Sequence, residues 1–291
     1  MKNTPPRGGL PRKDYRLKSH KCPTTMIKGT AIWQRSHDDT EARMLVVLKG
    51  FLSAGLLWAF LHSPECWAQT AQKETERTAE LLATLLDAGR VVVEQHQPLI
   101  NDPRKGDKGF SPDVFERLVL DEFFRQSQID LKSSASSLPP HTRDLLTRLL
   151  HASKEVVADA QFVINQRGIG YKNFIPATFG SQAARRFSKQ SQVTIKQTTL
   201  DPRNPQNAPD AYEETVLTRL AHQPASTTPI VEWVNGGRLL RAMMPIYYSE
   251  DCLMCHGSPK GILDISGYPR EGAQAGDLAG AISIQIPADH R

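Results

Sequence analysis

Cysteine is scarce in this chain: there are 4 among 291 residues. Cys22 and Cys66 lie in the first quarter of the sequence, and the other two lie close together near the C-terminal end. A structural zinc site needs four ligands and is commonly built from two cysteine pairs. Because no second pair follows the N-terminal segment, the scarcity argues against a zinc knuckle.

Excess positive charge is also missing from most of the chain. The formal net charge is +5, but residues 1–68 carry 11 Lys and Arg against 5 Asp and Glu, whereas residues 69–291 carry 25 against 26. A basic patch on the folded domain is the electrostatic footprint of a nucleic-acid partner. The basic character belongs to the N-terminal segment, so we expect no DNA or RNA partner.

The apolar run after Lys49 is too short to span a membrane. It covers residues 50–61, which is 12 residues, whereas a spanning helix needs roughly 20. From Met44 the sequence has the pattern of a secretory signal peptide, with a basic start, this apolar run, a helix-breaking Pro64 and a small-x-small cleavage site at Cys66-Trp67-Ala68. We therefore expect residues 44–68 to be a cleaved signal peptide; the alternative is an uncleaved signal that anchors the protein.

Residues 1–43 are basic, contain several prolines and show no sustained apolar period. Such a composition predicts a disordered leader. The alternative is an untranslated extension, because translation could start at Met26 or Met44 instead of Met1. The folded domain is expected over residues 69–291.

The C-terminal cysteines form the motif Cys252-Leu253-Met254-Cys255-His256, followed directly by Gly257. This spacing is typical of c-type haem attachment, in which both thiols add to the porphyrin vinyl groups and the imidazole binds the iron. Chance would place the motif in a chain of this composition roughly 2 times in 1,000. We expect Cys252 and Cys255 to form the thioethers and His256 to bind the iron of one covalent haem c.

Three other readings of the motif are zinc, a thioredoxin-like dithiol and two unrelated free thiols. A redox-active dithiol would open a helix after a strand, whereas Gly257-Ser258-Pro259 breaks any helix that follows the motif. An export signal favours the haem reading, since haem is attached covalently on the outer side of the bacterial inner membrane. The expected location is the periplasm.

The N-terminal part of the domain, about residues 69–166, has the periodicity of helices. Apolar residues recur at steps of three and four over residues 70–100, which predicts an amphipathic helix. Ser111-Pro112 is typical of a second helix start, and residues 142–165 show the apolar period again. The glycine-rich stretch 168–180 is expected to pack without forming a long regular element.

From Val193 onward, apolar and polar residues alternate as in strands. Asn235-Gly236-Gly237 separates two such segments, at 230–234 and 238–246, and predicts a hairpin. A short helix is expected over residues 212–220, and a last strand over residues 281–286. The pattern predicts an α+β fold, with N-terminal helices followed by an antiparallel sheet that has its helices to one side.

Four sequence motifs follow one another in the second half of the chain. In order, they are Arg203-Asn204-Pro-x-Asn207-x-Pro209-Asp210-x-Tyr212-Glu213, Arg241-x-Met243-x-Pro245-Ile246, Cys252-Leu253-x-Cys255-His256-Gly257 and Gly276-Asp277-Leu278-x-Gly280-Ala281-Ile282-Ser283. They resemble those of the bacterial PAS-like domains that bind a c-type haem, which were long described as a domain of unknown function. These domains occur as secreted single-domain proteins and as extracytoplasmic sensor regions of histidine kinases and chemoreceptors. The resemblance covers about residues 75–287 and implies a PAS-like sheet with the haem against it.

The resemblance implies redox sensing or electron transfer and does not imply an enzyme. One alternative is a structural module whose haem only stabilises the fold. Another is a haem peroxidase, for which the sequence offers no distal acid and base that can be assigned. Because the chain ends at Arg291, just after the last expected strand, we expect any signal to pass to a separate redox partner or membrane sensor protein.

Two arginines are candidates for contacts with the haem propionates. A guanidinium can bind a carboxylate through two hydrogen bonds, and Arg203 and Arg241 both lie in the motifs. The alternative readings are a solvated loop arginine for Arg203 and an exposed strand arginine for Arg241.

The motif does not supply a sixth iron ligand. The candidates are His96, His151, Met243, Met244 and no ligand at all. We expect His96, because it falls on the apolar stripe of the first helix; the alternative is a hydrogen-bonded core histidine. His151 lies beside charged residues, and Met243 and Met244 point to opposite faces of their strand, so at most one of the two can reach the iron.

Overall fold

The computed structural model describes residues 64–133 and 138–288. The chain divides into two units, and all of these residues belong to the second, which begins at Leu61. The leader, most of the signal peptide and the middle of the Ser/Pro linker lie outside the described residues. Within the described ranges, no helix is both long enough and apolar enough to cross a membrane.

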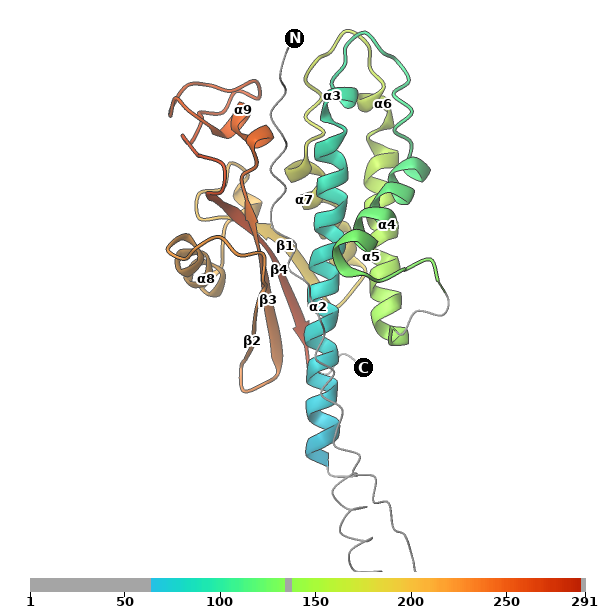
Figure 1. Cartoon of the computed structure of the whole chain (residues 1–291), viewed down its shortest axis with the longest axis vertical. Helices are drawn as coiled ribbons and strands as arrows, with labels where there is room; N and C mark the ends of the chain where they lie inside the picture. The colour runs from blue at the N-terminus through green and yellow to red at the C-terminus, as the bar shows by residue number, and fades with distance from the viewer. Residues whose placement is uncertain (1–63, 134–137, 289–291) are drawn as a thin grey trace, which may run out of the picture. The chain divides into compact units, whose positions relative to one another are not determined.

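The helices of the N-terminal part come in two series (Figure 1). The expected helices are confirmed: a long helix, a second helix that begins after Ser111, and a third long helix. Ser111 caps the second, since its Oγ accepts a hydrogen bond from the Val114 amide. The bounds are α2 (Pro64–Gln95), α3 (Gln97–Ile100), α4 (Pro112–Ser127), α5 (Pro140–Asp159), α6 (Gln161–Ile164) and α7 (Pro176–Lys189).

Helix α7 was not predicted. The stretch 168–180 was expected to contain no long regular element, but α7 begins inside it at Pro176. Proline at a first helical position is a start signal, and the stripe Phe179, Ala183 and Phe187 is fully buried. The glycines of this stretch masked that signal, because Gly180 stands inside the helix, where its missing side chain makes room for Gln197.

The sheet is antiparallel and has four strands in the order β1-β4-β3-β2. The predicted strands and the hairpin are confirmed: β2 pairs with β3 across Asn235-Gly236-Gly237. The 3-10 turn η1 (Pro205–Asn207) and helix α8 (Ala211–Ala221) connect β1 to β2. The strand bounds are β1 (Thr194–Thr198), β2 (Ile230–Val234), β3 (Leu239–Tyr247) and β4 (Leu278–Pro287).

The two faces of the sheet bury different cores. Leu240, Ala242 and Ile284 pack against the helices of the N-terminal part in one large apolar cluster. Met243 and Ala281 face the other way and pack under α8 (Figure 1). The expectation that all helices lie to one side of the sheet was therefore wrong, because the odd-numbered positions of β3 are buried as well.

The haem-type motif lies in an excursion, residues 248–277, between β3 and β4. These two central strands are antiparallel neighbours, so the excursion leaves and re-enters the sheet at the same end. Its base is closed by two backbone hydrogen bonds, from the Tyr248 amide to the Asp277 carbonyl at 3.0 Å and from the Gly276 amide to the Tyr248 carbonyl at 2.9 Å. We call residues 248–277 the motif loop.

Candidate functional site

The cysteines and the histidine of the motif are placed by two short helical turns. The 3-10 turn η2 (Glu250–Cys252) leads into α9 (Leu253–His256). Residues three apart on a helical turn share a face, so Cys252 and Cys255 lie on the same side. Both are half-buried free thiols. The turn ends at Gly257. Glycine is required there because a Cβ would lie 2.6 Å from the Leu253 carbonyl oxygen.

His256 is oriented by a carboxylate. Its Nδ1 lies 2.8 Å from Glu271 Oε2, and its ring packs against Tyr248 at a centroid distance of 4.9 Å. Burial alone would raise the pKa of Glu271, but hydrogen bonds from Arg203 and His256 hold it below its usual value. The ionised carboxylate accepts the Nδ1 proton, which leaves Nε2 as the nitrogen with a lone pair for a metal.

Arg203 joins three parts of the motif loop. Its guanidinium binds Glu271 through two hydrogen bonds, from Nε to Oε1 at 2.7 Å and from Nη2 to Oε2 at 2.9 Å. Nη1 donates to Asp264 Oδ2 at 2.7 Å, and Nη2 also donates to the Cys255 carbonyl at 2.9 Å. The guanidinium therefore fixes the motif turn, the following bend and the carboxylate that orients His256.

Asp264 is the buried end of this network. Its carboxylate accepts hydrogen bonds from the Ser266 amide at 2.8 Å, the Ser266 hydroxyl at 2.7 Å and the Tyr268 amide at 3.1 Å, besides that from Arg203. Burial alone would raise the pKa of Asp264, but these donors hold it far below its usual range. Burial, and after it the negative charge of Asp264, raises the pKa of the Cys255 thiol.

The two arginines expected at the haem propionates have partners within the protein. Arg203 is engaged with two carboxylates, and the Arg241 side chain, 8% exposed, lies 2.8 Å from Asp210 Oδ2 and stacks over the Tyr212 ring at 4.4 Å. The alternative of an exposed strand arginine is therefore wrong for Arg241, whereas the Arg203 side chain is partly exposed, at 22%. The propionate contacts stay predictions.

His96, the expected sixth ligand, has partners within the helical part. Its Nδ1 lies 2.7 Å from the Val92 carbonyl oxygen, and its ring packs against Phe110 at a centroid distance of 5.0 Å. These are the partners of the alternative, a packed and hydrogen-bonded histidine. Its role as an iron ligand stays a prediction.

The other candidate ligands also have local partners. His151 is exposed and lies 3.6 Å from Glu155. Met243 is fully buried under α8, and Met244 packs against the opposite core. The prediction that the two methionines point to opposite faces is confirmed.

Three carboxylates at the site were missed. Glu94 accepts a hydrogen bond from the Ser249 hydroxyl at 2.6 Å and lies 3.8 Å from the Cys252 sulfur. Asp264 and Glu271 surround Arg203 as described above. Asp264 and Glu271 could have been proposed from the sequence, because they are acidic residues in the glycine-rich segment that follows the motif. No sequence pattern pointed to Glu94.

The surface of the motif loop exposes large apolar side chains. One of them lies in the turn that carries the thiols, and the others follow it in the chain. Single exposed apolar residues are common, but a group of them in one loop is not. The group consists of Met254 at 68%, Ile262 at 57%, Leu263 at 64%, Ile265 at 60% and Tyr268 at 47% exposure. Within the described ranges, no group of three or more Cys, His, Asp and Glu is arranged to hold a metal ion.

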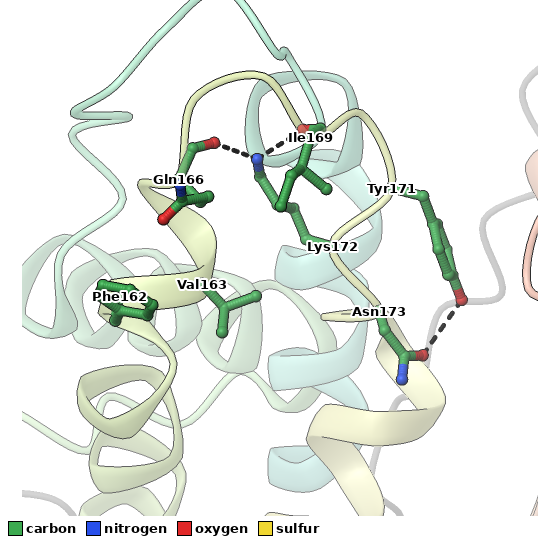
Figure 2. A pocket seen from close by; sticks show the side chains of 7 residues that line it. All are labelled: Phe162, Val163, Gln166, Ile169, Tyr171, Lys172 and Asn173. Atoms are coloured by element: carbon green, nitrogen blue, oxygen red, sulfur yellow. Dashed lines mark hydrogen bonds between the residues drawn. The ribbon is translucent and has the colours of Figure 1, made fainter.

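A shallow cavity of about 320 Å³ lies in the helical part, after α6. Figure 2 shows its lining, in which Tyr171 stands at one side, away from Phe162 and Val163. The Tyr171 hydroxyl donates a hydrogen bond to Asn173 Oδ1 at 3.2 Å, within the same loop. Burial raises the pKa of Tyr171.

Fold and site together define an α+β protein whose antiparallel sheet carries a Cys-x-x-Cys-His turn in one long excursion. Residues 68–287 match the model of the family described as Tll0287-like, so the chain belongs to this family. The resemblance predicted from the four motifs is confirmed.

A solved structure described as the cyanobacterial heme-protein Tll0287 is also similar, at 18% sequence identity and a TM-score of 0.37. The match covers 53% of this chain and 98% of that one. Comparison with curated proteins found no match.

We expect the change Arg203→Met to lower the free energy of unfolding by about 2–4 kcal/mol, because it leaves Asp264 and Glu271 without their cation. Denaturant titration measures this loss. The matched control is Arg219→Met, whose pair with Glu232 is more than a third exposed on both sides and should contribute about 0.5 kcal/mol or less. Equal losses for the two variants would contradict the role given to Arg203.

The stability that Arg203 supplies should depend on pH in one direction. The folded protein lowers the pKa of both Asp264 and Glu271, so their contribution is complete above the unfolded values, about 4 to 4.5, and is lost as the pH falls through the folded values. The difference in unfolding free energy between wild type and Arg203→Met should therefore be constant near neutral pH and shrink below about pH 4. A difference that grows on acidification would contradict this account.

Proposed function

We propose that this protein binds one haem c covalently through Cys252 and Cys255, with His256 as an iron ligand, and acts in redox sensing or electron transfer. The observation that carries the proposal is the Cys-x-x-Cys-His turn in which His256 Nδ1 is bonded to Glu271. A carboxylate that holds the second ring nitrogen is the usual companion of a metal-binding histidine. The family's structural relative is described as a heme-protein.

The chemistry of the donor set fits the group. Each thiol would add across one vinyl double bond, with the sulfur joining one carbon and the thiol hydrogen the other, so the addition consumes no oxidant or reductant. Both thiols are free and half-buried on one side of the turn. When bound, the haem supplies one-electron chemistry at its iron.

The exposed apolar side chains of the motif loop also support the proposal. Met254 stands between the two cysteines in the sequence, Ile262 and Leu263 follow in the same loop, and all three side chains are more than half exposed. A macrocycle attached at Cys252 and Cys255 offers an apolar face that such side chains can cover, which would remove their surface from water. Burial of this kind gives the loop a reason to expose apolar residues before the cofactor is attached.

The role we propose is redox rather than catalytic, with a separate redox partner or membrane sensor protein as the recipient. His256, Glu271 and Arg203 form an ordered network on one side of the proposed haem. An acid and base pair for peroxide chemistry would have to lie on the other side, and none was assigned from the sequence.

Purified protein made with haem-maturation machinery should carry haem that stays with the polypeptide in acid-acetone, because unfolding does not break thioethers. The absorption spectrum of the precipitate measures this. Cys252→Ser combined with Cys255→Ser should release the haem or lack it. Protein with stoichiometric zinc and no Soret band would refute the proposal.

The change Glu271→Gln should raise the reduction potential of the haem, because a neutral amide accepts the Nδ1 proton more weakly and leaves the imidazole a poorer donor to ferric iron. Spectroelectrochemical titration measures the potential. Glu250→Gln is the control, since Glu250 is an exposed carboxylate of the same loop that has no contact with His256. An equal shift in both variants would assign the effect to charge alone.

We also propose export to the periplasm through the signal at residues 44–68, with the mature N-terminus near Gln69. The small residues Cys66 and Ala68 stand at the two positions that a signal peptidase reads. The intact mass of protein recovered from the periplasm decides the point. A mass that retains the apolar run would mean a membrane-anchored protein.

A further inference from the structure

The helical part contains an internal duplication. Residues 78–127 and 142–191 align without a gap, and 19 of the 50 paired positions are identical, whereas unrelated stretches of ordinary composition would share about 3. The series α2, α3 and α4 thus corresponds to α5, α6 and α7. Six of the identical pairs lie in the short helices α3 and α6 and in the loops that follow them. They are Gln97, Ile100, Asn101, Gly106, Lys108 and Phe110, which correspond to Gln161, Ile164, Asn165, Gly170, Lys172 and Phe174.

The two copies hold each other's loops by reciprocal hydrogen bonds. Gln97 Nε2 donates to the Phe174 carbonyl at 2.7 Å, and Gln161 Nε2 donates to the Phe110 carbonyl at 3.0 Å. The side chain of Asn101 accepts from the Lys172 amide, and that of Asn165 accepts from the Lys108 amide. Figure 1 shows α3 and α6 at the same end of the two series. The copies are therefore related by an approximate two-fold axis.

Contacts at this axis confirm the relation. Thr78 and Thr142 occupy equivalent positions, and their buried hydroxyls lie 2.8 Å apart. Phe115 and Phe179 are also equivalent, and their rings meet edge to face at 5.2 Å.

The loop lysines perform the same task in both copies. Lys108 and Lys172 are each 5% exposed, and each ammonium donates to the backbone carbonyls six and three positions before it. The residue after each lysine has a positive φ, 63° at Gly109 and 55° at Asn173. The framework of the two loops has been retained.

The side chains that differ between the two loops stay local. Asp107 in the first copy accepts a hydrogen bond from the Gly109 amide at 2.8 Å. Its counterpart Tyr171 donates a hydrogen bond from its hydroxyl to Asn173 Oδ1 at 3.2 Å, as Figure 2 shows. Both side chains therefore bond within their own loop.

The difference that reaches the motif loop is on the long helix of the first copy. Glu94 corresponds to Ala158, which has no polar side chain. The Glu94 carboxylate accepts a hydrogen bond from the Ser249 hydroxyl at 2.6 Å and lies 3.8 Å from the Cys252 sulfur. The first copy thus contacts the motif loop beside Cys252.

We infer that the duplicated helical part forms one wall of the haem site, with the Glu94 carboxylate beside Cys252. This inference rests on the haem function proposed above. A negative charge beside the haem stabilises ferric iron. Glu94 therefore lowers the reduction potential.

The experiment compares variants of the holoprotein. Glu94→Gln should raise the reduction potential, because it removes the charge and keeps the shape. The matched control is Asp107→Asn, which removes a carboxylate of the same copy that bonds within its own loop and should leave the potential unchanged. Spectroelectrochemical titration measures the potential, and denaturant unfolding of each variant checks that it stays folded.

The outcomes separate the inference from the function on which it rests. If wild-type protein has no covalent haem, the proposed function fails. If the haem is covalent but Glu94→Gln gives the potential of Asp107→Asn, the function stands and the wall assigned to the helical part is overturned.

Discussion

The geometry of the site depends on the charge of Arg203. The motif loop contributes few side chains to either apolar core, so its shape must come from polar contacts. Arg203 supplies them: without its cation, Asp264 and Glu271 would be two carboxylates held near each other without a partner, and the Cys255 carbonyl would lose its donor. Because Glu271 also holds His256, the same cation sets the direction of the imidazole. The order of the site therefore follows from one partly buried ion-pair network.

A second ion-pair network lies on the face of the sheet that packs under α8. Arg241 reaches Asp210 and Glu213 at the start of α8, where Asp210 also caps the helix. The motifs that carry the family resemblance thus consist largely of residues that bind one another: the first supplies Arg203 and the carboxylates for Arg241, and the third is held by Arg203. The sequence identified these arginines as carboxylate donors but did not reveal the carboxylates within the chain that they bind. Their partners lie far along the chain, 61 and 68 residues away for Arg203, and no local pattern reveals such a pairing.

The sequence was sufficient for features that depend on local periodicity or spacing. The long helices, the hairpin at Asn235-Gly236-Gly237 and the place of the motif between two strands were predicted, because each follows from a period or a turn residue. The face on which α8 packs, the partners of His96 and the helix α7 were not, because tertiary contacts decide them. The duplication was present in the sequence at 19 of 50 positions, but single-helix periodicity does not detect it.

A duplication with a retained framework explains how a packed helical part can also contact the motif loop. Lys108 and Lys172 hold their own loops through backbone carbonyls, and the glutamine and asparagine pairs hold the loops to each other. The framework therefore does not depend on the side chain at position 94 or at its counterpart, position 158. The structure places a carboxylate against the motif loop in the first copy, at Glu94, and the second copy has Ala158 at the equivalent position. The asymmetry between Glu94 and Ala158 is therefore what a one-sided site on a two-fold scaffold requires.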